Sequence, residues 1–298
     1  MIDKNFIQKC QAFIEPNRFR LDEPMKLHTT FKIGGPADCL IFPASMEETE
    51  KVLALVSAYK LPLTILGNGS NVLVQDKGIR GVVVKFARPM AKIRHEGTRI
   101  IAGAGALLKD VSEAAAQNSL TGLEFACGIP GSIGGAIFMN AGAYDGEMKN
   151  VADTVRTVDR EGKIHTYSRD ELDLGYRPSR FPDNGESRPP GDSEAIRAKM
   201  EDFTERRESK QPLEMPSAGS TFKRPKGYFA GTLIQETGLK GLQVGGAQVS
   251  TKHAGFVVNA TGTATAADVR GLIHEVQQRV YKKHGVMLHP EVRIIGEA

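Results

Sequence analysis

Apolar residues recur every three to four positions in several segments of the chain, and this spacing predicts amphipathic helices. The clearest helix starts after Ser45, which forms a capping box with Glu48 and precedes an apolar face that runs to about Lys60. Near the end of the chain, Thr265 is expected to start a second helix and Gly285 to end it. The same spacing predicts further helices at 107–115, 193–210 and 229–237.

Short apolar runs between turn-forming residues predict strands instead. Residues 61–66 are expected to form a buried strand, joined by a tight turn of sequence GNGSN (67–71) to a second short strand at 72–74. The turn at 160–162 separates two runs that are typical of a β-hairpin. Further strands are predicted at 81–86, 255–259 and 290–297. Because strands and helices are mixed without an internal repeat, we expect an α+β fold.

Composition and charge narrow the functional classes. A chain of 298 residues predicts about two domains. The net charge of +4 is too small and too scattered for nucleic-acid binding, but it favours an anionic small molecule. No apolar run is long enough for a membrane helix, and the N-terminal segment does not resemble a signal peptide. Three widely separated cysteines (10, 39 and 127) predict reduced thiols, and a cytoplasmic monomer is expected.

Two glycine-rich segments are the most unusual feature of the sequence. Residues 127–144, CGIPGSIGGAIFMNAGAY, contain five glycines, more than an ordinary core helix or strand accommodates well. Glycine allows a ligand to lie directly against the main chain, and bare N–H groups suit a phosphate. GNGSN is a second such segment. The segments are therefore candidate anion cradles, and the alternative is a glycine-rich loop that packs tightly against a neighbouring strand.

Several familiar sites are excluded by their missing residues. The run Gly103-Ala104-Gly105 has Leu108 in place of the third glycine of a dinucleotide-binding fingerprint. A phosphate-binding GxxxxGK[ST] loop, a GxSxG nucleophile elbow and a histidine metal motif are all absent, and no metal site is expected. Two cradles without these motifs indicate a dinucleotide or nucleotide-sugar enzyme.

Six motifs in order resemble one enzyme family. They are ILGNGSNVLV (65–74), GIPGSIGGAIFMNAGAY (128–144), GYR (175–177), PSAGSTFKRP (216–225), KHAGFVVN (252–259) and PEVRIIGE (290–297). Together they closely resemble the UDP-N-acetylenolpyruvoylglucosamine reductase (MurB) family, over roughly residues 26–297. The chain lacks an extra tyrosine-bearing insertion and so resembles the shorter class of that family.

The resemblance implies a fold, a cofactor and a reaction. An FAD-binding region of the vanillyl-alcohol-oxidase (PCMH) type would comprise two α+β subdomains, 1–86 and 87–210. A substrate-binding domain would follow at 211–289, and a strand in 290–298 would return to the first subdomain. NADPH would reduce non-covalently bound FAD. The reduced FAD would in turn reduce UDP-N-acetylglucosamine enolpyruvate to UDP-N-acetylmuramate, a peptidoglycan precursor.

The resemblance also assigns roles to individual residues. Ser220 matches the serine that protonates the substrate carbon, Arg177 the arginine that stabilises the enolate, and Glu291 the carboxyl group that acts with it as a hydrogen-bond donor. Lys223 and Arg224 are candidate contacts to the substrate diphosphate, although two solvated charges are an equally ordinary interpretation. The implied FAD-binding residues are Gly67, Asn68, Gly69, Ser70, Asn71, Gly128, Ile129, Pro130, Gly131, Ser132, Gly134, Gly135 and Asn140.

Other interpretations remain open from the residues alone. A serine after glycine is more often a turn residue, and Glu291 alternates with apolar neighbours as on any half-exposed strand. The segment 181–191 is rich in proline and polar residues where the family ordinarily has an apolar strand. The alternatives are therefore another FAD oxidoreductase on the same scaffold, or an inactive relative that binds a nucleotide sugar.

Overall fold

The chain divides into two compact units, each assembled from separate stretches. The structure is a computed structural model that describes residues 2–172, 174 and 191–298. The first unit consists of Met1–Arg20, Leu40–Asn68 and Val83–Arg207, and the remaining three stretches form the second unit. The segment GNGSN is divided between the two units after Asn68. The division into three domains expected from the sequence stays a prediction.

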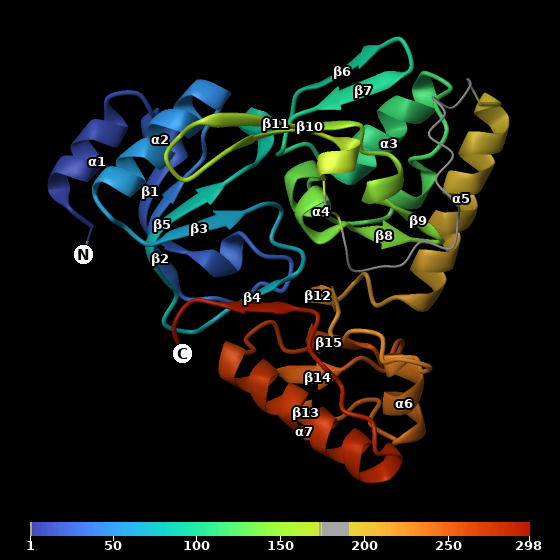
Figure 1. Cartoon of the computed structure of the whole chain (residues 1–298). Helices are drawn as coiled ribbons and strands as arrows, with labels where there is room; N and C mark the ends of the chain where they lie inside the picture. The colour runs from blue at the N-terminus through green and yellow to red at the C-terminus, as the bar shows by residue number, and fades with distance from the viewer. Residues whose placement is uncertain (1, 173, 175–190) are drawn as a thin grey trace. The chain divides into compact units, whose positions relative to one another are not determined.

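A four-stranded sheet carries its strands in the order β1-β2-β5-β3 (Figure 1). Their bounds are β1 Phe19–Pro24, β2 Pro36–Ile41, β3 Leu63–Leu66 and β5 Ile79–Lys85. Strand β5 lies inside the sheet and is almost entirely buried. Strand β3 was expected to be buried, but only Leu66 is, and Ile65 is 51% exposed. The reason is its place at the edge of the sheet, where an apolar run need not be covered on every side.

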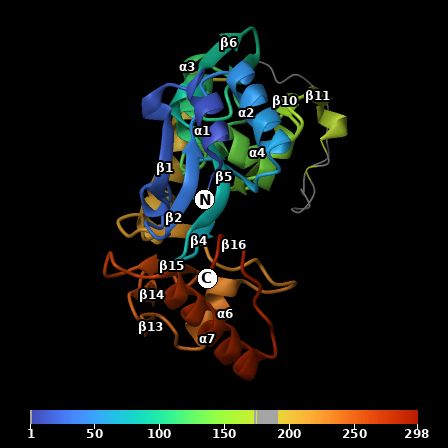
Figure 2. The same cartoon turned by 90° about the vertical axis from the view of Figure 1, so that its left-hand side faces the viewer.

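Helices α1 to α5 and short hairpins lie before residue 211. The predicted helices at 45–60, 107–115 and 193–210 and the predicted hairpin are confirmed. Helices α1 and α2 lie side by side in both Figure 1 and Figure 2. The helices are α1 (Lys4–Gln11), α2 (Met46–Ala58), α3 (Leu108–Gln117), α4 (Ile133–Met139) and α5 (Ser193–Lys210). The hairpins pair β6 (Ile93–Glu96) with β7 (Arg99–Ala102), β8 (Gly142–Ala143) with β9 (Gly146–Glu147), and β10 (Thr154–Val158) with β11 (Ile164–Ser168).

The second unit is built on a sheet in the order β12-β15-β14-β13, with helices α6 and α7 beside it (Figures 1 and 2). Its elements are β12 (Ser217–Ser220), α6 (Ala230–Glu236), β13 (Gln243–Val244), β14 (Ala247–Val249), β15 (Phe256–Asn259) and α7 (Ala266–His284). Buried side chains such as Leu272 and Val276 of α7 pack with Val249 and Val257 of the sheet. Strand β16 (Arg293–Ile295) pairs in parallel with β4 (Val72–Val74).

The two strands predicted on either side of GNGSN are present as β3 and β4, but they belong to different sheets. The sequence 61–74 resembles two strands about a turn, but each strand finds its partner elsewhere. β3 pairs at the edge of the four-stranded sheet, and β4 pairs with β16 near the end of the chain. GNGSN is therefore a connection between sheets and not a hairpin turn.

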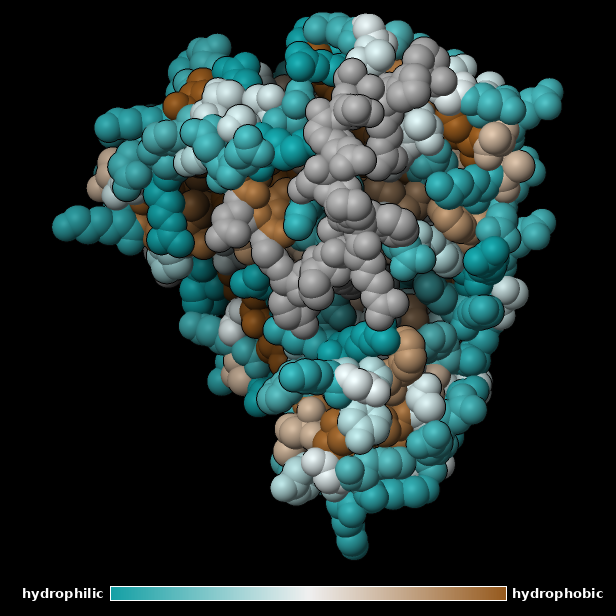
Figure 3. All heavy atoms as spheres, turned by 45° about the vertical axis from the view of Figure 1, so that its right-hand side comes forward, coloured by the Kyte–Doolittle hydropathy of each residue, from teal (hydrophilic) through white to brown (hydrophobic). Residues whose placement is uncertain are grey.

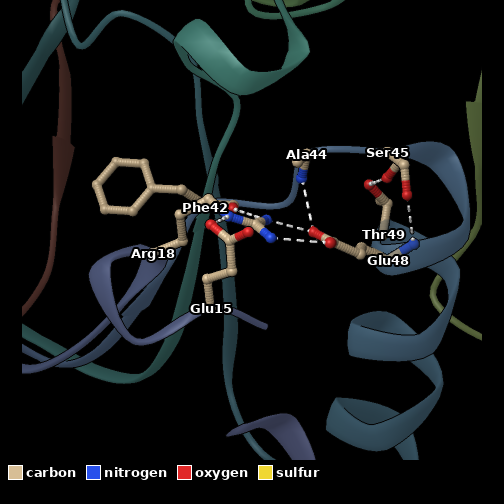
Figure 4. A network of polar contacts seen from close by, with 7 residues as sticks. All are labelled: Glu15, Arg18, Phe42, Ala44, Ser45, Glu48 and Thr49. Atoms are coloured by element: carbon tan, nitrogen blue, oxygen red, sulfur yellow. Dashed lines mark hydrogen bonds and ion pairs between the residues drawn. The ribbon is translucent and has the colours of Figure 1, made fainter. Parts of the chain in front are cut away.

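Helix α2 begins with an ion pair that the sequence did not predict (Figure 4). Ser45 caps the helix by accepting from Glu48 N at 3.1 Å, as expected. The Glu48 carboxylate does not complete the capping box. It accepts from Ala44 N at 2.7 Å and pairs through both oxygens with Arg18, which also donates to Phe42 O at 3.1 Å. The Arg18 and Glu48 side chains are only 12% and 18% exposed.

Arg18→Met is expected to destabilise the protein by about 2 kcal/mol, because it leaves a largely buried carboxylate without its cation. The hydrogen bond from Arg18 lowers the pKa of Glu48 below its ordinary value of 4.5. The stability from this pair is therefore present above that value and is lost as the pH falls below it. Urea denaturation between pH 7 and 3 tests both statements. Glu47→Gln, which breaks an exposed pair with Lys51 on the same helix, is the control and should cost under about 0.5 kcal/mol.

Within the part of the chain that the structure describes, none of the helices is both long and apolar enough to cross a bilayer. Hydrophilic side chains dominate the face seen in Figure 3, and the apolar ones form small separate patches between them. All three cysteines are buried free thiols, as the sequence predicted.

Candidate functional site

The glycine-rich segment 127–144 contains a helix, where a loop of bare N–H groups was expected. Helix α4 includes Gly134 and Gly135, and the N–H groups of Ile133 and Gly134 already donate to Ala106 O and Ala104 O. A Cβ on Gly134 would lie 3.1 Å from Ala104 Cβ, so this glycine permits tight packing. The expectation of free amides is wrong for these two N–H groups, because backbone pairing occupies them.

The two glycine-rich segments meet in the first unit. Asn68 Nδ2 donates to Pro130 O at 2.7 Å, across 62 positions of sequence. A Cβ on Gly67 would lie 2.5 Å from Ser132 Oγ, so only glycine fits there without displacing the hydroxyl. Ser132 is 1% exposed, and its Oγ has no hydrogen-bond partner within the described part of the chain. A buried hydroxyl without a partner is costly, and a bound ligand oxygen would satisfy it.

Arg207 is a second unsatisfied polar group beside the same segment. A Cβ on Gly128 would lie 2.7 Å from Arg207 Cδ, and the buried Nε of Arg207 has no hydrogen-bond partner among the described residues. Burial lowers the pKa of Arg207, but a guanidinium still keeps its charge. Tyr144 closes this region by stacking on Phe203 at 4.4 Å between ring centroids. A partly buried cation whose Nε is buried fits an anionic or carbonyl-bearing ligand.

Other predicted cofactor residues in the first unit have structural contacts. Asn140 is 3% exposed and adopts a left-handed conformation at the end of α4. Its Nδ2 donates to Glu147 Oε2 at 2.8 Å and to Leu174 O at 3.2 Å, and its Oδ1 accepts from Lys149 N at 2.9 Å. This side chain therefore holds the local fold. Its assignment to the cofactor stays a prediction.

The main chain of 129–131 is also anchored within the first unit. Ile129 N donates to Ala126 O, and Gly131 O accepts from Leu108 N at 2.9 Å. Together with the bond from Asn68 to Pro130, these contacts fix the backbone of the cradle before any ligand binds.

Lys85 lies at the base of the first cradle and was missed in the sequence. It is the last residue of β5, is 8% exposed, and donates from Nζ to Gly67 O at 2.8 Å. Burial lowers its pKa to about 8. A lysine inside the otherwise apolar run GVVVKF was the available signal, because a buried strand rarely carries a charge without a purpose.

The free energy of unfolding is expected to rise from pH 8 to 10.5 by up to about 3 kcal/mol because of Lys85. The folded pKa of about 8 lies below the ordinary 10.5, so the unfolded chain binds the extra proton in this window. The measurement is denaturant unfolding across this range for the wild type and Lys85→Met. The Lys85-dependent part of the rise should vanish in the variant, and equal slopes would contradict the assignment.

Ser220 and Glu291 lie on neighbouring segments of the second unit. Glu291 N donates to Thr221 O at 2.8 Å, and Lys223 N donates to His289 O at 2.8 Å. Two stretches 70 residues apart in sequence are thus paired antiparallel, with Ser220 exposed at the end of β12 and Glu291 half-buried. Arg177 and residues 181–190 lie outside the described residues.

The second half of GNGSN is tied to the same segments. Arg293 N donates to Asn71 O at 3.0 Å, two residues after Glu291. Thr30, which sequence reasoning missed, joins Gly69 to β12: its N–H donates to Gly69 O at 3.1 Å and its Oγ1 to Ser217 O at 2.6 Å. A Cβ on Gly69 would lie 2.3 Å from His28 O, so this glycine serves close backbone packing. Ser70, beside it, is half-buried.

The predicted substrate-binding cations are both on the surface. Lys223 and Arg224 are exposed, and the Arg224 guanidinium lies 3.9 Å from the centre of the Phe229 ring. Phe229 is 59% exposed. The stacking restricts the guanidinium while leaving its N–H groups accessible. This arrangement can bind an anion.

Comparison with known proteins gives the family. A family model of the UDP-N-acetylenolpyruvoylglucosamine reductase C-terminal domain matches residues 211–295, and a model of an FAD binding domain matches 37–168. A UDP-N-acetylenolpyruvoylglucosamine reductase of Clostridium perfringens is 53% identical over 301 residues, covering 98% of this chain and 97% of the relative. This chain belongs to the UDP-N-acetylenolpyruvoylglucosamine reductase family.

Further relatives agree with this family. The reductase of Clostridium botulinum (strain Hall) is 48% identical over 307 residues, covering 99% of this chain and 98% of the relative. A crystal structure of the MurB reductase from Thermus caldophilus matches with a TM-score of 0.76 and 37% identity, over 93% of this chain and 98% of that one. The family, the fold class, the FAD cofactor and the oxidoreductase class expected from the motifs are thereby confirmed.

Proposed function

We propose that the protein reduces UDP-N-acetylglucosamine enolpyruvate to UDP-N-acetylmuramate in peptidoglycan precursor synthesis, with FAD as cofactor and NADPH as electron donor. The observation that carries the proposal is the pairing of the Ser220 and Glu291 segments in a chain of this family. The names of the relatives describe a reductase of the same substrate. Buried free thiols are compatible with the proposed cytoplasmic location. A monomeric state is also proposed.

The residues around the two cradles fit FAD. Ser132 Oγ and Arg207 Nε, which have no partner among the described residues, are donors that a diphosphate or a ring carbonyl would satisfy. Gly67 and Gly128 lie directly against these two side chains, where a Cβ would clash. We assign the cofactor to these residues and to the predicted set at 67–71, 128–132, 134, 135 and 140. When bound, FAD supplies the hydride transfer that links NADPH to the enolpyruvyl group.

The chain's own residues supply the proton and the charge stabilisation. Ser220 would hold a proton on Oγ and give it to the carbon that carries the substrate carboxylate. Glu291 would assist as a hydrogen-bond donor. Arg177, with its fixed positive charge, would stabilise the enolate that forms before protonation. Exposed Lys223 and Arg224 would bind the diphosphate, for which the stacked guanidinium of Arg224 is already oriented.

The deciding experiment follows NADPH oxidation by the purified, FAD-loaded protein with and without the enolpyruvyl substrate under anaerobic conditions. Oxidation that depends on this substrate, with UDP-N-acetylmuramate as the product, is the expected result. In a separate aerobic assay, oxygen consumption with a hydroxylated substrate would instead indicate another FAD oxidoreductase. Binding of the UDP-sugar without turnover would indicate an inactive relative.

A further inference from the structure

Thr221 occupies the position between the two proposed catalytic residues, and all of its polar groups are hydrogen-bonded. It is 4% exposed. Its N–H donates to Gly255 O at 2.9 Å, its carbonyl accepts from Glu291 N at 2.8 Å, and its Oγ1 accepts from Val257 N at 2.9 Å. One buried residue thus connects the strand that carries Ser220 to the segment that carries Glu291 and to β15.

The bond from Val257 N to the Thr221 hydroxyl lies beside an irregularity in the sheet. The pairing of β12 with β15 is irregular between Ser217 and Ser220, and Gly219 in this interval has φ of +75°. Val257 is 2% exposed, so water cannot readily satisfy its N–H. A buried N–H without a partner costs about 1–3 kcal/mol. The Thr221 hydroxyl supplies an acceptor for this buried N–H beside the irregular part of the ladder.

Gly255, the other partner of Thr221, is itself fixed by His253. The N–H of Gly255 donates to His253 Nδ1 at 3.0 Å, and the His253 ring packs edge-on against Phe256. Burial lowers the pKa of His253, which favours the neutral ring that can accept this bond. Gly255, which accepts from the Thr221 N–H, is therefore itself held by the His253 ring.

We propose that Thr221 is a positioning residue for the reduction, whose hydroxyl keeps Ser220 and Glu291 in fixed relation through its bond to Val257 N–H. The proposal rests on the function proposed above. Thr221 itself touches neither substrate nor cofactor in this assignment. Its effect on the rate is indirect: without its bond to Val257 N–H, the catalytic groups would shift. A misplacement of about 1 Å in a catalytic group can lower a rate roughly a hundredfold.

The test compares Thr221→Val, which keeps the shape but loses the acceptor, with Thr221→Ser, which keeps the acceptor. Both half-reactions are measured in the FAD-loaded protein by stopped-flow spectroscopy. Thr221→Val is expected to slow reoxidation by the enolpyruvyl substrate roughly tenfold to a hundredfold, with flavin reduction by NADPH unchanged. Thr221→Ser should remain within about threefold of the wild type, and in Thr221→Val the Val257 and Glu291 amides should exchange hydrogen faster.

Thr49→Val is the matched control, because Thr49 is 2% exposed and its hydroxyl also bonds a backbone group, Ser45 O at 2.8 Å. It should change stability but neither half-reaction. Wild-type reoxidation in Thr221→Val, or equal slowing of both half-reactions, would overturn the positioning role while leaving the proposed function intact. A wild-type protein that never reacts with the enolpyruvyl substrate would instead refute the function itself, and the Thr221 role with it.

Discussion

Ser220→Ala is expected to abolish reduction of the enolpyruvyl substrate while NADPH still reduces the flavin. General acid catalysis by a positioned side chain contributes roughly a hundredfold to ten-thousandfold, and alanine has no proton to give. Ser220 is exposed at the end of β12, so its removal should not cost stability through lost packing. The measurement is single-turnover kinetics of the two half-reactions in separate stopped-flow experiments.

The control for this variant is Ser57→Ala, which removes an exposed hydroxyl within α2. Both half-reactions should then match the wild type. If Ser220→Ala reoxidised its flavin at a near-normal rate, the proton would have to come from another group. If NADPH reduction failed as well, the substitution would have disturbed the cofactor rather than the proton transfer.

Local signals in the sequence predicted the element boundaries well. Helix α7 is the clearest case, because its two ends are determined by bonds between near neighbours. Thr265 starts the helix as predicted, where it forms a capping box with Asp268, and Gly285 ends the helix with φ of +67°. Such contacts depend on residues within four positions of each other, so the sequence contains the whole signal.

Pairing between distant strands could not be predicted in the same way. The run 61–74 has the pattern of two strands and a turn, yet β4 pairs with β16 near the other end of the chain. The glycines of 127–144 also misled, because Gly134 and Gly135 lie inside a helix and Gly134 packs closely against Ala104. In both cases the partner lies far along the chain, and periodicity does not identify it.

The motifs identified the residues that are proposed to carry the chemistry. They did not identify the residues that hold the segments of those residues in place. Ser220 and Glu291 were found through motifs, and their segments are paired. Thr30 and Thr221 act through bonds from a side chain to a distant backbone group, which leave no pattern in the sequence. Arg207 lies in a densely charged helix, so its sequence context resembles that of a surface residue. In the structure its Nε is buried.

Gly67→Ala is expected to lower the affinity for FAD roughly tenfold to a hundredfold with little loss of stability. The added Cβ would lie 2.5 Å from Ser132 Oγ, and this hydroxyl is the end of a side chain that can rotate away. Rotation would remove a donor from the proposed cofactor site, and a hydrogen bond to a charged group is worth about 1.5–3 kcal/mol. The measurements are titration of the apoprotein with FAD and the shift in melting temperature that added FAD produces.

Ser132→Ala should lose the same affinity, because it removes the same donor. The double variant Gly67→Ala/Ser132→Ala should lose no more than either single variant, since the two changes act on one hydroxyl. Gly271→Ala, a glycine in α7 whose Cβ would make only ordinary contact with Val244 at 3.4 Å, is the control and should bind FAD as the wild type does. Additive losses in the double variant, or normal affinity in Gly67→Ala, would show that the Ser132 hydroxyl does not hold the cofactor.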